Sequence, residues 1–178
     1  ELNLSKLGVN ELNPMQELML SEYPTHRHIV LLSPTGSGKT LAYLLPLLQT
    51  IDSSSDALQA LIVVPSRELA IQTQQVMREL SSTLRSYACY GGRPTMDEHR
   101  VIRSLLPHVI VGTPGRILDH FNKENFTSQH IHSFVIDEFD KCLELGFQQQ
   151  IADVRQFLVN ATKCVLLSAT DSPHISMF

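Results

Sequence analysis

The chain has 178 residues, 43% of them hydrophobic, and its 14 basic and 18 acidic side chains give a formal net charge of −4. This length suits one domain with a sizeable core, and the composition excludes an intrinsically disordered protein. The mild acidity argues against a nucleic-acid-binding protein, since such proteins usually carry a basic surplus.

The sequence shows neither a membrane anchor nor a disulfide framework. No apolar run reaches the roughly 18–20 residues that a membrane-spanning helix needs, and Glu1–Leu4 lacks the basic start of a signal peptide. Cys89, Cys142 and Cys164 are odd in number and widely spaced, which predicts buried thiols in a reducing compartment. We therefore expect a monomeric cytoplasmic protein without membrane contact, with the nucleus or nucleolus open if the source is eukaryotic.

Five short apolar runs alternate with segments of helical periodicity. The runs are rich in β-branched residues and Leu, as in a parallel sheet that is covered on both faces. They span residues 29–32, 60–64, 109–111, 134–136 and 165–167. Apolar residues recur at helical spacing from Leu69 to Leu84 and from Ile151 to Leu158. The pattern predicts a single α/β domain over residues 1–178, with a mostly parallel β-sheet and helices on both faces.

A polar turn follows each predicted strand. These turns are rich in Gly, Pro or charged residues and span residues 33–40, 65–70, 112–116, 137–140 and 168–170. In open α/β sheets, ligands bind at the carboxyl ends of the strands. We therefore expect the functional site along this edge.

The turn after the first strand has the sequence of a phosphate-binding loop. Gly36 and Gly38 let backbone amides curl around an anion, and the following helix N-terminus adds unpaired N–H groups. Lys39 supplies positive charge for the β- and γ-phosphates, and Thr40 a hydroxyl for Mg²⁺. Ser33 stands where the strict P-loop pattern has Gly, and the alternative is a Gly/Ser-rich turn that caps a helix. The predicted ATP-binding residues of this loop are Thr35, Gly36, Ser37, Gly38, Lys39 and Thr40.

Two carboxylates follow the fourth apolar run. Asp137 is suited to hold Mg²⁺ together with Thr40, because Mg²⁺ prefers oxygen ligands and keeps part of its water shell. Glu138 can orient or deprotonate an attacking water, which predicts hydrolysis. The alternative is that both acids only begin a solvated helix. We expect Lys39, Asp137 and Glu138 to be the catalytic residues.

Taken in order, these motifs resemble the first RecA-like domain of a DEAD-box RNA helicase. The family's Ala-x-Thr-Gly-Ser-Gly-Lys-Thr stands at 33–40 with Ser33 first, and its Pro-Thr-Arg-Glu-Leu-Ala at 65–70 with Ser66 for Thr. Its glycine doublet, Thr-Pro-Gly-Arg, Ser-Ala-Thr and Leu-x-x-Gly-Phe are intact at 91–92, 113–116, 168–170 and 143–147. Its Asp-Glu-Ala-Asp stands at 137–140, with Phe139 in place of Ala.

The resemblance also implies an adenine-binding glutamine upstream of the P-loop. Pro14-Met15-Gln16 resembles that motif, although Asn13 replaces its Thr and Leu12 its Pro. A glutamine amide both donates and accepts, so Gln16 can pair with the N6/N7 edge of adenine. Taken alone, Gln16 is as well explained as an ordinary residue at a helix start.

RNA binding and coupling are implied by the same resemblance. The residues expected along the RNA backbone are Pro65, Arg67, Gly91, Gly92, Thr113, Pro114, Gly115 and Arg116. Helix N-termini and arginines in such loops contact phosphates and 2′-hydroxyls without reading sequence. An ion pair that positions neighbouring loops is the alternative for Arg67. Asp140 is expected to reach Ser168 and Thr170, which couples the ATP state to RNA, and Phe139 is expected to be accommodated by local repacking.

The resemblance implies ATP-Mg²⁺ as cofactor, RNA as partner, and a second RecA-like domain that this chain does not contain. We expect the chain to bind adenine nucleotide weakly, to be nearly inactive alone, and to serve RNA unwinding with its second domain. A different P-loop enzyme and an ATP-gated RNA clamp with little catalysis are the alternatives. The acidity does not contradict RNA binding, because residues 65–116 hold seven arginines and four acids, a local surplus of +3.

Overall fold

The computed structural model describes residues 2–178. Their strands are β1 (His28–Leu32), β2 (Ala60–Val63), β3 (Ser86–Cys89), β4 (Val109–Gly112), β5 (Ser133–Ile136) and β6 (Lys163–Ser168). All six pair in parallel, in the order β1-β6-β5-β2-β4-β3. The predicted fold class is confirmed.

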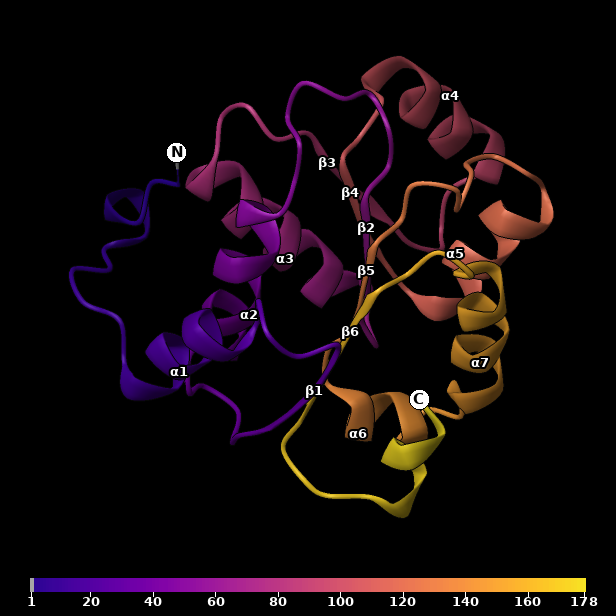
Figure 1. Cartoon of the computed structure of the whole chain (residues 1–178). Coiled ribbons are helices and arrows are strands. Elements are labelled where there is room, and N and C mark those ends of the chain that lie inside the picture. The colour runs from indigo at the N-terminus through magenta and orange to yellow at the C-terminus, as the bar shows by residue number, and fades with distance from the viewer. Residues whose placement is uncertain (1) are drawn as a thin grey trace.

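Helices cover both faces of this sheet (Figure 1). On one side lie α1 (Pro14–Glu22), α2 (Lys39–Gln49) and α3 (Arg67–Leu80). On the other lie α4 (Thr95–Leu105), α5 (Pro114–Asn122), α6 (Phe139–Glu144) and α7 (Gln148–Phe157). Single 3₁₀ turns at Ser5–Leu7 and Pro173–Met177 complete the described chain. Among residues 2–178, no helix has the length and apolar character to cross a bilayer.

The central strands are apolar throughout because they contribute to two cores. In β2, Ala60 and Ile62 pack into the core under α1–α3, whereas Leu61 and Val63 pack into the core under α4–α7. Successive side chains of a strand point to opposite faces, so a strand buried on both sides needs an unbroken apolar run.

The two edge strands differ from the sequence-based expectation. β3 was not predicted, because Ser-Tyr-Ala-Cys forms no run of β-branched residues. β1 was expected to be buried, but it lies at the edge, and Val30 and Leu32 are about half exposed on its uncovered face. The predicted helix reaching Leu84 ends earlier, since α3 stops at Leu80 and Ser81 has extended backbone.

Candidate functional site

The predicted motifs lie at one edge of the sheet because every strand runs in the same direction. The strand order also sorts them. The P-loop, the Ser-Ala-Thr turn and the acidic turn follow the adjacent strands β1, β6 and β5. The turns at 65–70, 113–116 and 91–92 follow the adjacent strands β2, β4 and β3. The topology therefore places the expected nucleotide motifs on one half of the edge and the expected RNA motifs on the other.

Backbone hydrogen bonds connect the first residues of these loops to the neighbouring strands. The Ser33 N–H donates to the Ser168 carbonyl at 3.0 Å, and the Asp137 N–H to the Val63 carbonyl at 2.9 Å. On the other half, the Thr113 N–H donates to the Cys89 carbonyl at 3.1 Å. The sheet pattern thus continues one residue into the site, which fixes where each loop begins.

The P-loop has the backbone conformation that its glycines predict. Gly36 and Gly38 have φ values of 80° and 87°, in the left-handed region that favours glycine. Ser33, the departure from the strict pattern, contacts Ser37 across the loop, with 2.6 Å between the two Oγ atoms. α2 begins at Lys39 directly after the loop, so the unpaired amides of its first turn face the same position.

Gln16 and Asn13 contact the P-loop from the first turn of α1. Gln16 Nε2 donates to the Gly38 carbonyl at 3.2 Å, and Asn13 Nδ2 donates to the Ser37 carbonyl at 3.0 Å. The two residues also cap α1 reciprocally, since the N–H of each donates to the side-chain oxygen of the other at 2.9 Å. Gln16 is therefore a helix-start residue and a P-loop contact at once. One N–H of its amide and one lone pair remain for a ligand, and its pairing with adenine stays a prediction.

Asp137 ends β5 as a buried carboxyl, only 3% exposed. Burial raises the pKa of Asp137 from 3.8 to about 6, and the negative charge of Glu138 acts in the same direction. The Glu138 N–H, which donates to Asp137 Oδ1 at 2.8 Å, and the Lys39 ammonium oppose that rise in pKa. A buried carboxyl whose charge is only partly compensated suits a bound cation.

The donor set fits Mg²⁺ in particular. Thr40 lies in the first turn of α2 and, among residues 2–178, its hydroxyl has no hydrogen-bond partner. A hydroxyl and a carboxylate are the hard oxygen ligands that Mg²⁺ takes when it also holds phosphates and water. Thr40 and Asp137 would hold the ion between the P-loop and β5.

Glu138 has a strained backbone. Its φ of 48° and ψ of 51° place a non-glycine residue in the left-handed region at the start of α6. Such conformations cost about 1–3 kcal/mol and cluster at functional sites. The Glu138 side chain is 21% exposed, and its Oε2 lies 3.3 Å from Lys141 Nζ. This strained residue directly follows Asp137, at the carboxyl edge of the sheet where the expected nucleotide motifs lie.

The predicted coupling residues Asp140, Ser168 and Thr170 follow the adjacent strands β5 and β6, but Asp140 is not hydrogen-bonded to the other two in the described part of the chain. The Ser168 Oγ donates to the Thr170 carbonyl at 2.6 Å. Within residues 2–178, Asp140 makes no hydrogen bond to either residue. The contact that the sequence predicted is therefore not formed in this structure, in which Ser168 is satisfied by its own loop.

Phe139 is part of the core beside the acidic turn. Its ring is fully buried with Cys142 and lies edge-on to Phe178, with 5.3 Å between the ring centroids. The bulky ring packs in the core and against Phe178, which lies in the segment after the Ser-Ala-Thr turn.

The expected RNA half presents two helix N-termini and a glycine turn. α3 begins at Arg67, where Ser66 Oγ accepts the Leu69 N–H at 3.3 Å, and α5 begins at Pro114.

Gly91 and Gly92 are exposed, and Gly92 has a φ of 96°. Pro65 is buried and fixes the loop root, while Thr113 and Gly115 lie at the start of α5. Exposed amides at such positions suit phosphate oxygens.

Tyr90 and Arg93 were missed by the sequence analysis. The Arg93 guanidinium lies 4.8 Å from the centre of the Tyr90 ring, and that of Arg67 lies 6.0 Å from it. The Arg67 side chain is 60% exposed, and its ion pair with Glu68, at 3.7 Å, is exposed as well. An aromatic residue directly before the glycine doublet was the available signal, since aromatic rings beside basic groups are common in single-strand binding.

Arg116 is held by the protein itself. It is 13% exposed, and its Nη1 lies 3.1 Å from Glu98 Oε1 and 3.0 Å from Thr95 Oγ1. Its Nη2 donates to the Arg93 carbonyl at 2.8 Å. A guanidinium has five N–H donors, so the two hydrogen bonds to Thr95 and Arg93 leave three donors for other contacts. The expected phosphate contact of Arg116 stays a prediction.

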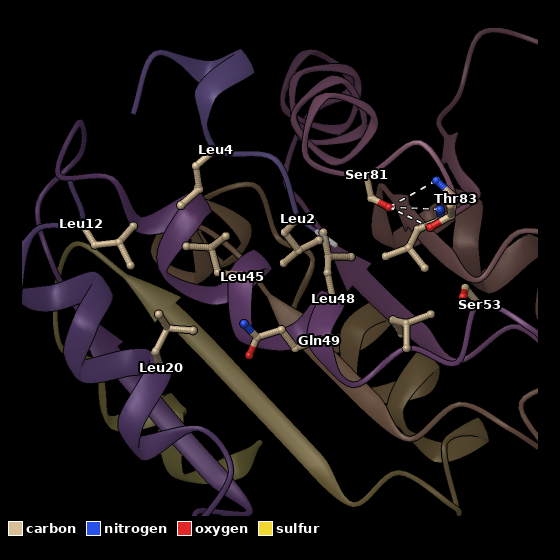
Figure 2. A pocket seen from close by; sticks show the side chains of 12 residues that line it. Leu2, Leu4, Leu12, Leu20, Leu45, Leu48, Gln49, Ser53, Ser81 and Thr83 are labelled. Carbon is tan, nitrogen blue, oxygen red and sulfur yellow. Dashed lines mark hydrogen bonds between the residues drawn. The ribbon is translucent and has the colours of Figure 1, made fainter. Parts of the chain in front are cut away.

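A separate apolar cavity of about 500 Å³ lies between α1, α2 and the loop after α3 (Figure 2). Leucine side chains dominate its wall, among them Leu12, Leu20, Leu45 and Leu48. None of the predicted nucleotide or RNA residues lines it. A charged nucleotide would lose its hydration there without gaining partners, so this cavity is not the expected ATP site.

Comparison with known proteins agrees with this arrangement. The profile of the DEAD/DEAH box helicase family matches residues 13–178. The chain is 40% identical over 151 residues to eukaryotic initiation factor 4A of Drosophila melanogaster, covering 84% of this chain and 37% of that protein. It is 38% identical over 172 residues to the ATP-dependent RNA helicase CshA of Listeria monocytogenes, covering 94% and 32%. The chain thus spans about a third of the length of these relatives.

Solved structures show the same fold. A DEAD box protein from Methanococcus jannaschii superposes with a TM-score of 0.90 at 27% identity, covering 98% of this chain and 48% of that one. Dbp5 of S. cerevisiae, solved bound to Nup159, Gle1 and ADP, superposes with a TM-score of 0.83 at 29% identity, covering 98% and 46%. The motifs, the strand order and these similarities agree, and the chain belongs to the DEAD/DEAH box helicase family.

Proposed function

We propose that this chain is the ATP-binding, first RecA-like domain of an RNA helicase, and that it unwinds or remodels RNA only together with a second such domain. The observation that carries the proposal is the sorting of loops along one sheet edge, with nucleotide motifs after β1, β6 and β5 and RNA motifs after β2, β4 and β3. An intracellular location is part of the same proposal, and the three free cysteines support it.

In this mechanism the P-loop binds the phosphates of ATP. The amides around Gly36 and Gly38 surround the phosphate oxygens, and Lys39 adds positive charge at the β- and γ-phosphates. Thr40 and Asp137 would hold Mg²⁺, which would supply positive charge to neutralise the phosphates. Gln16 selects adenine with the part of its amide that the P-loop leaves free. The ADP bound in the Dbp5 structure supports an adenine nucleotide as the ligand.

Glu138 orients and deprotonates the attacking water. Glu138 directly follows the proposed Mg²⁺ ligand Asp137 with left-handed backbone, and Lys141 is the only basic side chain within ion-pair distance of it among residues 2–178. RNA binds the second half of the edge through the N-termini of α3 and α5 and the Gly91–Gly92 turn. These contacts involve the RNA backbone, so binding is independent of sequence and weakens with salt.

The test is ATP turnover with and without RNA. The chain alone is expected to bind adenine nucleotide weakly and to hydrolyse it barely. A protein that joins it to a second RecA-like domain is expected to show RNA-stimulated turnover. Full RNA-stimulated activity of the 178 residues alone would contradict the need for a second domain, and stimulation by DNA but not RNA would contradict the substrate.

A further inference from the structure

Glu98 lies on α4, a helix that carries none of the predicted site residues, yet its carboxylate faces two of the site loops. The side chain is 1% exposed. A buried carboxylate is costly unless it is paired and hydrogen-bonded. Two hydrogen bonds and one ion pair satisfy Glu98. The Tyr90 backbone N–H donates to it at 3.1 Å and His120 Nε2 at 3.0 Å, and Arg116 Nη1 forms the ion pair at 3.1 Å.

These donors belong to two separate loops. Tyr90 directly precedes the Gly91–Gly92 turn after β3, whereas Arg116 and His120 lie in the first two turns of α5 after β4. Among the described residues, the last backbone hydrogen bond between the two segments is donated by the Thr113 N–H to the Cys89 carbonyl. Beyond that point, the Glu98 carboxylate connects them, because Oε2 accepts from one loop and Oε1 from the other.

The tautomer of His120 agrees with this role. Asn125 Nδ2 lies 2.9 Å from His120 Nδ1 and donates to it, so the ring proton lies on Nε2 and points to Glu98. Cys89, Glu98 and His120 also offer ligand atoms within 4.8 Å of one another, as a metal site would. His120 already donates to Glu98 Oε1 and Arg116 forms an ion pair with the same oxygen, and burial raises the pKa of the Cys89 thiol well above its usual value. The cluster is therefore better explained as a closed hydrogen-bond network than as a metal site.

We propose that Glu98 is a positioning residue for RNA binding. It does not touch RNA; it fixes the Gly91–Gly92 turn and the N-terminus of α5 at the spacing that the RNA backbone requires. The inference rests on the proposed RNA-binding function of these two loops. The inference also explains why Arg116 is mostly buried. Its guanidinium forms an ion pair with Glu98 and so helps to hold the two segments together.

Simple electrostatics and the positioning role predict opposite outcomes. Removing a negative charge beside a phosphate-binding surface strengthens RNA binding, because less charge repels the backbone. If Glu98 positions the loops, its removal weakens RNA binding despite the gain in positive charge. The sign of the change therefore separates the two explanations.

The experiment uses a protein that joins this chain to a second RecA-like domain. It measures the affinity of this protein for a short fluorescein-labelled polyuridine, and for a fluorescent ADP as a control. Glu98→Met keeps the length of the side chain and removes every acceptor. Glu98→Gln makes the same charge change and keeps one acceptor oxygen. Asp97→Asn is the matched control, because Asp97 is the neighbouring acid on α4 and its side chain is 58% exposed.

We expect Asp97→Asn to bind RNA at least as tightly as wild type. Glu98→Gln is expected to bind RNA more weakly than wild type, and Glu98→Met more weakly still. Loss of the network is expected to cost about tenfold in RNA affinity in Glu98→Met, with ADP affinity changed less than about twofold. RNA affinity of a folded Glu98→Met at or above that of wild type would overturn the positioning role. Failure of the wild-type two-domain protein to bind RNA would overturn the proposed function itself.

Amide hydrogen exchange of the wild-type chain gives a second measurement that needs no variant. The Tyr90 N–H lies beyond the last residue of β3, and its acceptor is Glu98 Oε2. We expect this amide to exchange slowly, whereas the amides of Gly91 and Gly92 exchange fast. Fast exchange at Tyr90 would show that the carboxylate does not hold the turn, and would overturn the inference even if Glu98→Met does not fold.

Discussion

Gln16 Nε2 donates a hydrogen bond to the Gly38 carbonyl at 3.2 Å, which joins the first turn of α1 to the last residue of the P-loop. Asn13 makes a parallel contact with the Ser37 carbonyl at 3.0 Å. Both side chains are oriented by the cap that they form on α1. The phosphate-binding backbone is therefore supported by a helix that precedes it in the sequence, so a change in either part is expected to affect nucleotide binding.

Gly38→Ala tests this support. A Cβ at Gly38 would lie 2.6 Å from Gln16 Nε2, at a φ of +87°. The substitution is expected to lower the affinity for a fluorescent ADP at least tenfold, and to reduce the stability by about 1–3 kcal/mol because of the strained backbone. Gly36→Ala is the matched control, since Gly36 has a φ of +80° and nothing lies within 4 Å of its added Cβ. Equal losses of affinity in the two variants would show that the Gln16 contact contributes nothing.

Glu138→Gln tests the assignment of the general base. The amide keeps the shape of the side chain but cannot accept a proton from water. In a protein that joins this chain to a second domain, ATP turnover is expected to fall by at least about 100-fold, with nucleotide and RNA affinities unchanged. Glu144→Gln, an exposed acid at the end of α6, is the control for the loss of one charge. Turnover within a factor of two of wild type would remove Glu138 from the catalytic residues.

Most of the fold could be predicted because the central strands bury both faces. Ala60–Val63 and Phe134–Ile136 must be apolar at every position, so each appears as an unbroken run in the sequence. The edge strands lack this constraint. β3 contains only short or polar residues beside Tyr87, and β1 exposes every second side chain, so their existence or burial depends on neighbours that the local sequence does not reveal.

The position of the site could also be predicted, but its internal connections could not. Glycines, Lys39 and the acidic pair occur as local motifs, and parallel strands bring them to one edge. The bonds of Arg116 to Arg93, Thr95 and Glu98 join residues that lie on different elements. The sequence marks Arg116 as basic and loop-borne, which fits a phosphate contact equally well. Only the three-dimensional arrangement shows that its guanidinium is mostly enclosed.

Phe139→Ala restores the small residue that is usual in the family, and it tests what the ring contributes. Because Phe139 is fully buried, the truncation is expected to reduce the free energy of unfolding by about 3–5 kcal/mol. Phe178 lies edge-on to it at 5.3 Å, so a double-mutant cycle with Phe178→Ala is expected to give a coupling of about 0.5–1.5 kcal/mol. Urea unfolding measures both quantities.

Phe126 packs on Phe121 instead, so the losses of unfolding free energy in Phe126→Ala and Phe139→Ala should add without coupling.

His108 predicts a pH dependence of stability at the opposite edge of the sheet. Its Nδ1 accepts the Arg85 backbone N–H at 3.0 Å, and its Nε2 donates to the Ser55 carbonyl at 2.9 Å, so the bonded form is neutral. Burial, followed by the charge of Arg85, lowers the pKa of His108 below 6.5, against the weaker opposite influence of Asp56 and Asp52. Below pH 6.5 the unfolded chain therefore binds a proton that the folded chain does not, and stability falls as the pH is lowered.

This dependence can be measured as the urea midpoint between pH 7.5 and 5. The contribution of His108 is complete above its unfolded pKa of 6.5 and is lost as the pH falls through the lower folded value. His108→Gln is expected to be less stable than wild type at pH 7.5, with a smaller loss between the two pH values. The exposed His130 supplies the control, and His130→Gln should keep the full wild-type dependence. If the pH dependence of His108→Gln equals that of wild type, another group is responsible, because this variant lacks the imidazole that takes up the proton in the unfolded chain.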